Sequence, residues 1–242
     1  MSSPPTIAVI AAGEMGAAIA ARLTAHGCTV LTDLTSRSPG TIARAERAGM
    51  HHAPLSEICT SRGVHWILSI VPPSDAHAFA LRCLDAGLGR DGYESPVFVD
   101  CNAVNPASSR EIGRILRERA PRVEFLDGGI IGGPPRSEAD DPKKATYEPN
   151  LYASADKEVE ERGTLKAFGE LRAFGLPVRI MEGAGVGGAS ALKMSYSVSG
   201  ISGTSFRMML TILPCLQGIM KGLSGLLTTM VLGTRLARSR HT

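Results

Sequence analysis

The feature that most constrains this chain is a strand–turn–helix–strand pattern within residues 6–33. The apolar run 7–11 is typical of a buried strand, and a glycine-containing turn, 12–16, follows it. A stretch of small residues then predicts a helix that ends at Gly27, because glycine adopts the left-handed conformation of a helix C-terminus without strain. A second strand, 28–32, ends at Asp33. This order predicts one βαβ unit of a parallel sheet.

The glycine turn has the composition of a pyrophosphate-binding loop. Backbone N–H groups at a helix N-terminus bind a phosphate only where no Cβ blocks its approach. Residues 11–16, AAGEMG, keep the second and third glycines of G-x-G-x-x-G and replace the first by alanine. We therefore predict that this turn binds a dinucleotide; the alternative is a tight turn in another kind of parallel α/β protein. The predicted pyrophosphate contacts are Gly13, Glu14 and Met15, and Gly16 completes the cofactor-binding turn as its packing glycine.

Composition narrows the class of protein further. The 242 residues are 43% hydrophobic and 20% charged, which is typical of a globular protein with a sizeable core. A net charge of +3, without a basic stripe carrying aromatic residues, argues against a nucleic-acid partner. The five cysteines form no C-x-x-C pair and the histidines have no ligand partners at a suitable spacing, so we predict neither disulfides nor a metal site.

The sequence gives no sign of a secretory or membrane-spanning segment. Residues 1–5 lack the charged and apolar regions of a signal peptide, so we expect a cytoplasmic protein. The apolar stretch that begins at Met208 is interrupted by Pro214, Gln217 and Lys221, and no run reaches the length of a membrane helix. We therefore expect no membrane partner.

The G-x-M-G ending of the turn, at residues 13–16, resembles the beta-hydroxyacid dehydrogenase and 6-phosphogluconate dehydrogenase superfamily. Within it, the chain is most similar to proteins with a phosphogluconate-dehydrogenase-type NAD-binding C-terminal domain. Motifs over most of residues 6–197 carry this resemblance. It implies a nicotinamide dinucleotide as the cofactor and a small molecule as the substrate.

Two residues bear on the choice of cofactor. Asp33 ends the second strand, where a carboxylate accepts hydrogen bonds from the adenosine ribose and favours NAD. Arg37 lies in the segment TSRS, which resembles the loop that binds the extra phosphate of NADP in the superfamily. We expect NADP, with NAD as the alternative. Both residues would also suit an ordinary turn.

Further cofactor contacts are expected where later strands end. Val71 ends a strand predicted at 64–71 and Pro72 follows it, and strands of open α/β sheets present their carboxyl ends to the ligand. Asn102 follows another strand, 97–100. The resemblance places Asn102 near the nicotinamide, and the alternative is an Asx turn or helix cap.

The substrate contacts rest on the resemblance. Gly132 and Gly133 match two residues of a Ser-Gly-Gly loop whose backbone binds the substrate carboxylate, but Ile131 stands at the serine position. Lys193 follows a glycine-rich linker on a predicted helix and matches the catalytic lysine, which exchanges a proton with the substrate hydroxyl. Ser197, one helical turn later, occupies the usual asparagine position. Lys221 is the second lysine of the pattern.

These patterns predict a doubly wound α/β domain, 1–182, and a short, incomplete all-α domain, 183–242. Within the first domain we predict a strand at 123–127 followed by a glycine loop, and one amphipathic helix over 157–174. The expected activity is NAD(P)-dependent hydride transfer to or from a small hydroxy acid. The alternative is a dinucleotide-binding protein without catalysis.

The segment 198–217, VSGISGTSFRMMLTILPCLQ, interrupts the helical pattern of the superfamily. Joining Ser197 to Gly218 restores KMSYSGIMKG, and GTG-AGT and CAG codons at the ends of the segment would form splice sites. We interpret it as a retained intron, with a genuine loop insertion as the alternative. This form would then be interrupted, truncated and inactive, whereas the spliced full-length form would form a homodimer.

Overall fold

The computed structural model describes residues 3–135 and 148–199. The chain divides into two compact units, Met1–Ser195 and Tyr196–Thr242, and the first contains the whole described sheet. Of the predicted helical domain, 183–242, the described part reaches Ser199, so Lys221 and residues 200–217 of the predicted interruption lie outside it.

One sheet of eight strands has the order β3-β2-β1-β4-β5-β6-β7-β8. The strands are β1 Thr6–Ile10, β2 Thr29–Thr32, β3 Met50–His52, β4 Val64–Ser69, β5 Val97–Asp100, β6 Phe125–Ile131, β7 Asn150–Ser154 and β8 Val178–Ile180. Every neighbouring pair is parallel except β6 and β7. The order reverses between β1 and β4, and this is where open α/β sheets form a crevice for a ligand.

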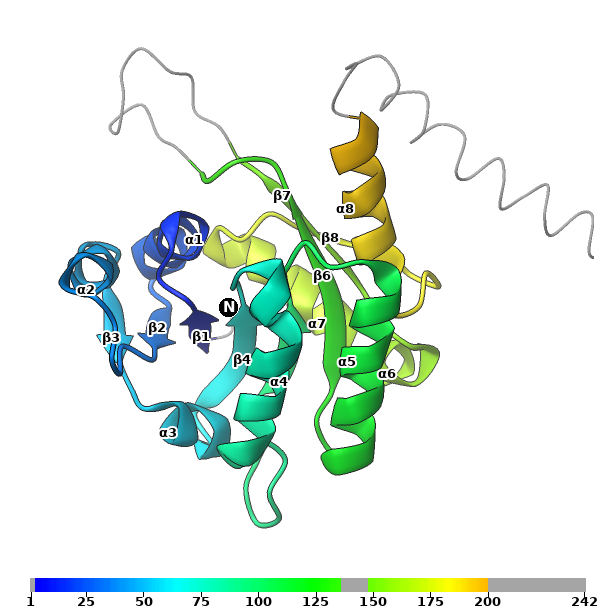
Figure 1. Cartoon of the computed structure of the whole chain (residues 1–242), viewed down its shortest axis with the longest axis horizontal. Coiled ribbons are helices and arrows are strands. Elements are labelled where there is room, and N and C mark those ends of the chain that lie inside the picture. Colours follow the sequence, from blue (N-terminus) through cyan, green and yellow to red (C-terminus); the bar gives the residue numbers. More distant parts are fainter. Residues whose placement is uncertain (1–2, 136–147, 200–242) are drawn as a thin grey trace, which may run out of the picture. The chain divides into compact units, whose positions relative to one another are not determined.

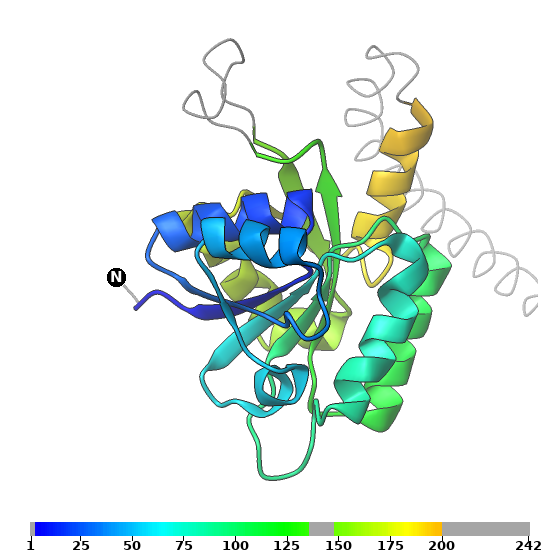
Figure 2. The same ribbon diagram turned by 60° about the vertical axis from the view of Figure 1, so that its left-hand side comes forward.

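Helices cover both faces of the sheet (Figures 1 and 2). They are α1 Glu14–Ala25, α2 Pro39–Arg47, α3 Leu55–Thr60, α4 Ala76–Asp85, α5 Pro106–Arg119, α6 Lys157–Glu161, α7 Thr164–Gly169 and α8 Gly188–Ser199, with 3-10 helices η1 Pro73–Asp75 and η2 Glu170–Phe174. One core joins α1, α2 and α7 to the sheet, through Leu23 and Phe168 for example. The other joins α3, α4 and α5, through Ile58 and Phe79. The predicted doubly wound, Rossmann-type fold is confirmed.

Two details of the predicted elements were wrong. The strand expected at 123–127 runs on as β6 to Ile131, so Gly128 and Gly129 belong to a strand. A Cβ on Gly128 would lie 2.9 Å from the carbonyl oxygen of Asp100, and one on Gly129 would lie 3.0 Å from that of Ala189. These glycines therefore permit close approach of the neighbouring backbone, although glycine disfavours strands.

The second error concerns the helix expected over 157–174. It is broken into α6, α7 and η2, because Gly163 takes the left-handed conformation with φ of 85° between the first two. The three-residue strand β3, which follows α2 and includes His51 and His52, was not predicted.

Within the described part of the chain, no helix is long and apolar enough to cross a bilayer.

Candidate functional site

The glycine turn joins β1 to α1 as predicted, with Gly13 as the N-cap of the helix. The amide of Ala17 donates to the carbonyl of Gly13 over 2.9 Å and is the first intrahelical hydrogen bond. The N–H groups of Glu14, Met15 and Gly16 thus have no acceptor within the helix. A helix N-terminus of this kind attracts an anion through both its free N–H groups and its dipole.

The two glycines of the turn have different roles. A Cβ on Gly16 would lie 2.0 Å from the carbonyl oxygen of Ala11, so this glycine is needed for the helix to pack against β1. A Cβ on Gly13 would meet no atom within 4 Å, and its φ of −71° suits any residue. Nothing in the fold therefore requires glycine at Gly13. The open space above it fits the approach of a phosphate.

Arg44 adds a cation to this turn that the sequence analysis missed. It lies on α2, is half-buried, and its Nη1 donates to the carbonyl of Ala12 over 3.1 Å. The guanidinium is thus held beside the N-terminus of α1, where it would favour an anionic ligand. Its signal in the sequence was weak, because Arg44 is one of two basic residues on α2 and only the fold brings it to the turn.

Asp33 and Arg37 lie where β2 ends, as expected from the sequence. Asp33 is half-buried, and its Oδ1 accepts the amide of Thr35 over 2.9 Å. Burial raises the pKa of Asp33, but the hydrogen bonds from Thr35 and the electrostatic effect of His52 outweigh it, so the pKa is lowered and the group is a carboxylate. Arg37 is exposed and makes no ion pair within residues 3–135 and 148–199.

Asn102 joins the ends of two strands. Its Oδ1 accepts the amide of Val71 over 2.7 Å, and its Nδ2 donates to Ser69 Oγ over 2.8 Å and to Asp100 Oδ1. The side chain is 3% exposed. These contacts are neither an Asx turn nor a helix cap of Asn102, because Oδ1 binds an amide of a different strand end and fixes the loop that carries Val71 and Pro72. The place of Asn102 near the nicotinamide stays a prediction.

Asp127, on β6, is a buried centre that the sequence analysis did not recognise. Its carboxylate accepts from Ser109 Oγ at 2.8 Å and Ser154 Oγ at 3.3 Å. It also accepts from the amide of Gly187 at 3.0 Å, and from the amide and Oγ of Ser190 at 3.0 and 2.5 Å. Asp127 therefore joins α5 and the start of α8 to the sheet, and it also contacts Ser154 of the neighbouring strand β7.

Lys193 lies on α8, one helical turn beyond Ser190, and is half-buried. A Cβ on Gly129 would lie 3.3 Å from the Cβ of Lys193, so the lysine passes directly over β6. Burial lowers the pKa of Lys193, while the nearby carboxyl group of Asp100 opposes that effect. A lysine with a lowered pKa exchanges protons more readily near neutral pH.

The remaining substrate residues are only partly described. Gly132 and Gly133 follow β6 immediately, and Gly132 has φ of 123°, a conformation that favours glycine. Ser197 lies on α8, but its side chain and the whole of Lys221 lie outside the described part. The structure therefore brings Lys193 and β6 together and leaves the contacts of Ser197 and Lys221 as predictions.

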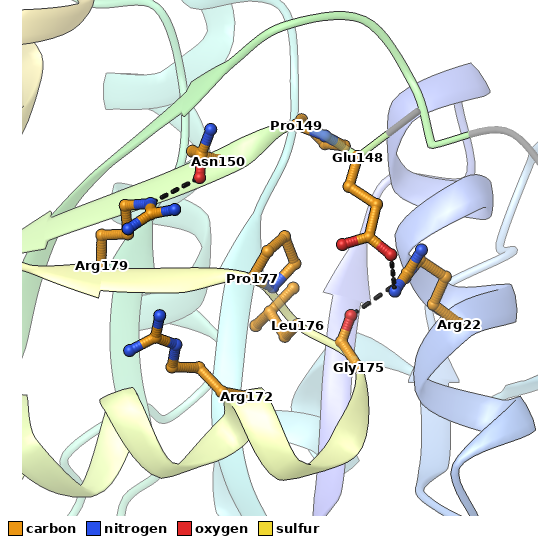
Figure 3. Close-up of a pocket in the computed structure, with 9 residues that line it drawn as sticks. All are labelled: Arg22, Glu148, Pro149, Asn150, Arg172, Gly175, Leu176, Pro177 and Arg179. Carbon is orange, nitrogen blue, oxygen red and sulfur yellow. Dashed lines mark hydrogen bonds and ion pairs between the residues drawn. The ribbon is translucent and has the colours of Figure 1, made fainter. Parts of the chain in front are cut away.

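A basic pocket of about 280 Å³ lies elsewhere, between α1, β7 and the segment η2–β8 (Figure 3). Arg22 in this pocket pairs with Glu148 over 2.7 Å, and Arg179 donates to Asn150 over 2.6 Å. None of the predicted cofactor residues lines it. In the described ranges, no group of three or more histidine, cysteine, aspartate or glutamate side chains is arranged to hold a metal ion.

The fold and the glycine turn define a dinucleotide-binding protein of the Rossmann type. The chain belongs to the family described as the NAD binding domain of 6-phosphogluconate dehydrogenase, whose profile matches residues 6–141. This confirms the resemblance inferred from the G-x-M-G turn. A comparison with curated protein sequences returned no match.

The chain is also similar in fold to solved structures. The conserved protein MTH1747, described as of unknown function with structural similarity to 3-hydroxyacid dehydrogenases, is 26% identical with a TM-score of 0.60. The match covers 79% of this chain and 63% of that one. An imine reductase from Myxococcus stipitatus in complex with NADP+ is 23% identical, with a TM-score of 0.57 and coverage of 89% and 65%. The chain thus spans less than two thirds of these structures.

Proposed function

We propose that the protein is an NADP-dependent oxidoreductase of the beta-hydroxyacid dehydrogenase type, with NAD as the alternative cofactor. Its substrate would be a small hydroxy acid. The observation that carries this proposal is the half-buried Lys193, held over β6 with a lowered pKa. It lies on the helix that Asp127 anchors against β6.

The cofactor would be held at the N-terminus of α1, with Arg44 beside the turn and Arg37 available for the extra phosphate of NADP. Pro72 would flank the cofactor from the loop after β4. When bound, the nicotinamide supplies the hydride acceptor or donor. A similar imine reductase has been solved with NADP+, and its V8 variant with NAD+, which supports a nicotinamide dinucleotide without deciding between the two.

Lys193 would take the hydroxyl proton of the substrate as the hydride leaves its carbon, and would return a proton in the reverse reaction. The backbone N–H groups of Gly132 and Gly133 would bind the substrate carboxylate, and Ser197 and Lys221 would orient the hydroxy acid. Ile131 replaces the serine of the related loop, so its hydroxyl contact is missing. This change favours a substrate different from that of the simple hydroxy-acid dehydrogenases.

A second candidate function is dinucleotide binding without catalysis. It is favoured by the segment 198–217, which separates Lys193 from Lys221 and contains Gly200, Gly203 and Pro214, all unfavourable within a helix. We therefore expect the 242-residue form to bind NADP without turning over a substrate. We place the protein in the cytoplasm, and the buried free thiols of Cys28, Cys59, Cys83 and Cys101 support this proposal.

The test is a titration of NADP and NAD, followed by a screen of hydroxy acids with the 242-residue chain and with a variant lacking residues 198–217. We expect both forms to bind NADP and only the shortened variant to reduce it. Lys193→Met in the shortened variant should abolish reduction and keep NADP binding. Reduction that survives Lys193→Met would refute the role of the lysine, and failure of both forms to bind a dinucleotide would refute the proposal entirely.

A further inference from the structure

Two buried carboxyl groups lie side by side on β5 and β6, Asp100 at the end of β5 and Asp127 within β6. Asp100 and Asp127 are register partners across these parallel strands and are 1% and 0% exposed. Like charges placed opposite each other on a sheet destabilise it. The arrangement therefore needs compensating contacts on each carboxyl group.

The carboxyl groups of Asp127 and Asp100 differ in the hydrogen bonds that they accept. Asp127 accepts five hydrogen bonds from side chains and amides, which together stabilise a carboxylate. The Oδ1 of Asp100 accepts the amide of Asn102 over 3.2 Å and also its side-chain Nδ2. Its Oδ2 is buried and has no hydrogen-bond partner within residues 3–135 and 148–199. A buried oxygen of this kind is costly unless a partner compensates it.

The position of α8 identifies the charged group that faces Asp100. Ser190, on the first turn of α8, is bound to Asp127, and Lys193 follows three residues later on the same side of the helix. The Cβ of Lys193 lies against Gly129, two residues beyond Asp127 on the same face of β6. The lysine is therefore brought to the end of the sheet where Asp100 lies.

The titratable groups around Asp100 in the described part of the chain are Asp127 on β6, Lys193 on α8 and the adjacent Cys101. Burial raises the pKa of Asp100 to about 6, and the charge of Asp127 adds to this rise. The hydrogen bonds from Asn102 and the charge of Lys193 act in the opposite direction and lower the pKa. Burial also raises the pKa of the Cys101 thiol, so this group stays neutral near pH 7.

We propose that Asp100 is a positioning residue for Lys193, and that its buried carboxylate is the counter-charge beside which the lysine ammonium forms. The inference rests on the proposed role of Lys193 as the acid and base. When the lysine nitrogen takes the hydroxyl proton, the hydride leaves with its electron pair for the nicotinamide, and the new ammonium lies near an existing carboxylate. Asp100 itself gains and loses no proton in this step.

The first test measures the protonation of Lys193 in the 242-residue chain. The rate at which acetic anhydride labels Lys193 is followed against pH by mass spectrometry, in the wild type and in Asp100→Asn. Because a nearby carboxylate raises the pKa of an amine, we expect its removal to lower the labelling midpoint by about one pH unit. Asp85→Asn, which removes an exposed carboxylate paired with Arg119, is the matched control and should leave the midpoint unchanged. Identical midpoints in Asp100→Asn and the wild type would overturn the proposal.

A second variant covers the case in which Asp100→Asn does not fold. A carboxyl group whose folded pKa is raised stabilises the protein below its unfolded pKa of about 4, and this stability is lost as the pH rises through about 6. Lys193→Met removes the charge that lowers the pKa of Asp100, so the loss of stability should extend to higher pH. The same pH dependence of unfolding in Lys193→Met and the wild type would contradict the pairing.

These measurements separate this inference from the proposed function. If Lys193→Met retains hydride transfer while Asp100→Asn shifts the labelling midpoint, the catalytic role fails and the charge pairing stands. If Lys193→Met abolishes hydride transfer and neither the midpoint nor the pH dependence of unfolding changes, the lysine is catalytic without Asp100 as its counter-charge.

Discussion

Replacing Gly13 by valine should abolish cofactor binding without unfolding the protein. The residue has φ of −71° and ψ of −175°, which valine adopts readily, and a Cβ there would meet no atom within 4 Å. A substitution without a clash or strain changes the free energy of unfolding by about 0.5 kcal/mol or less, and the loss of glycine at an N-cap adds about 1 kcal/mol, so the fold is retained. The added side chain would occupy the space through which a phosphate reaches the N-terminus of α1.

The expected loss of affinity follows from the amides that the valine would block. Each hydrogen bond to a charged group is worth about 1.5–3 kcal/mol. Losing two of the three contacts from Glu14, Met15 and Gly16 would cost about 3–6 kcal/mol, which is at least a 100-fold rise in the Kd for NADP. The loss should be similar for NAD, because both cofactors carry the same pyrophosphate.

Isothermal titration calorimetry with NADP measures the affinity, and thermal unfolding checks the fold. Gly63→Val is a control away from the turn, since a Cβ on Gly63 makes only an ordinary contact of 3.7 Å with Ser61 Oγ. Gly16→Ala should instead destabilise the fold by about 1–3 kcal/mol, because its Cβ would lie 2.0 Å from the carbonyl of Ala11. A folded Gly13→Val protein with wild-type affinity would refute this account of the turn.

Three further predictions concern the binding of the cofactor and the mature messenger RNA. Arg37→Ala should weaken the binding of NADP by about 1.5–3 kcal/mol and leave the binding of NAD nearly unchanged in parallel titrations, because only NADP carries the extra phosphate. Equal losses of affinity for the two cofactors would show that Asp33 decides the preference. Arg44→Leu should weaken the binding of both cofactors in those titrations, since its guanidinium lies beside Ala12 in the turn that binds either pyrophosphate. An unchanged affinity for both would assign Arg44 a structural role. Sequencing the mature transcript should show a message without the codons for 198–217, and a message that retains them would refute the retained intron.

Much of the nucleotide-binding half could be predicted because its signals are local. Gly27 and Gly49 end their helices with φ of 85° and 72°, and the first of these was predicted from the sequence as the end of its helix. The first strand, the turn and α1 follow one another within residues 6–25, so periodicity and glycine positions were sufficient. The family match confirms the class of protein that this pattern indicated.

The rest depended on contacts between distant residues. The length of β6 was missed because its glycines are disfavoured in strands unless another backbone comes close, and Ala189 is 60 residues away from Gly129 in the chain. Asp127 was not recognised as a buried centre, because its partners Ser109, Ser154 and Ser190 are spread over three elements. No local pattern identifies such donors before the fold is known.

The central claim, hydride transfer assisted by Lys193, is tested most directly by following the hydride itself. A hydroxy acid found in the screen is labelled with deuterium on its carbinol carbon and incubated with NADP and the variant that lacks residues 198–217. The account predicts that mass spectrometry finds the deuterium in NADPH, and that Lys193→Met binds NADP but transfers none. Transfer at the wild-type rate by Lys193→Met, or NADPH that forms without deuterium, would contradict it.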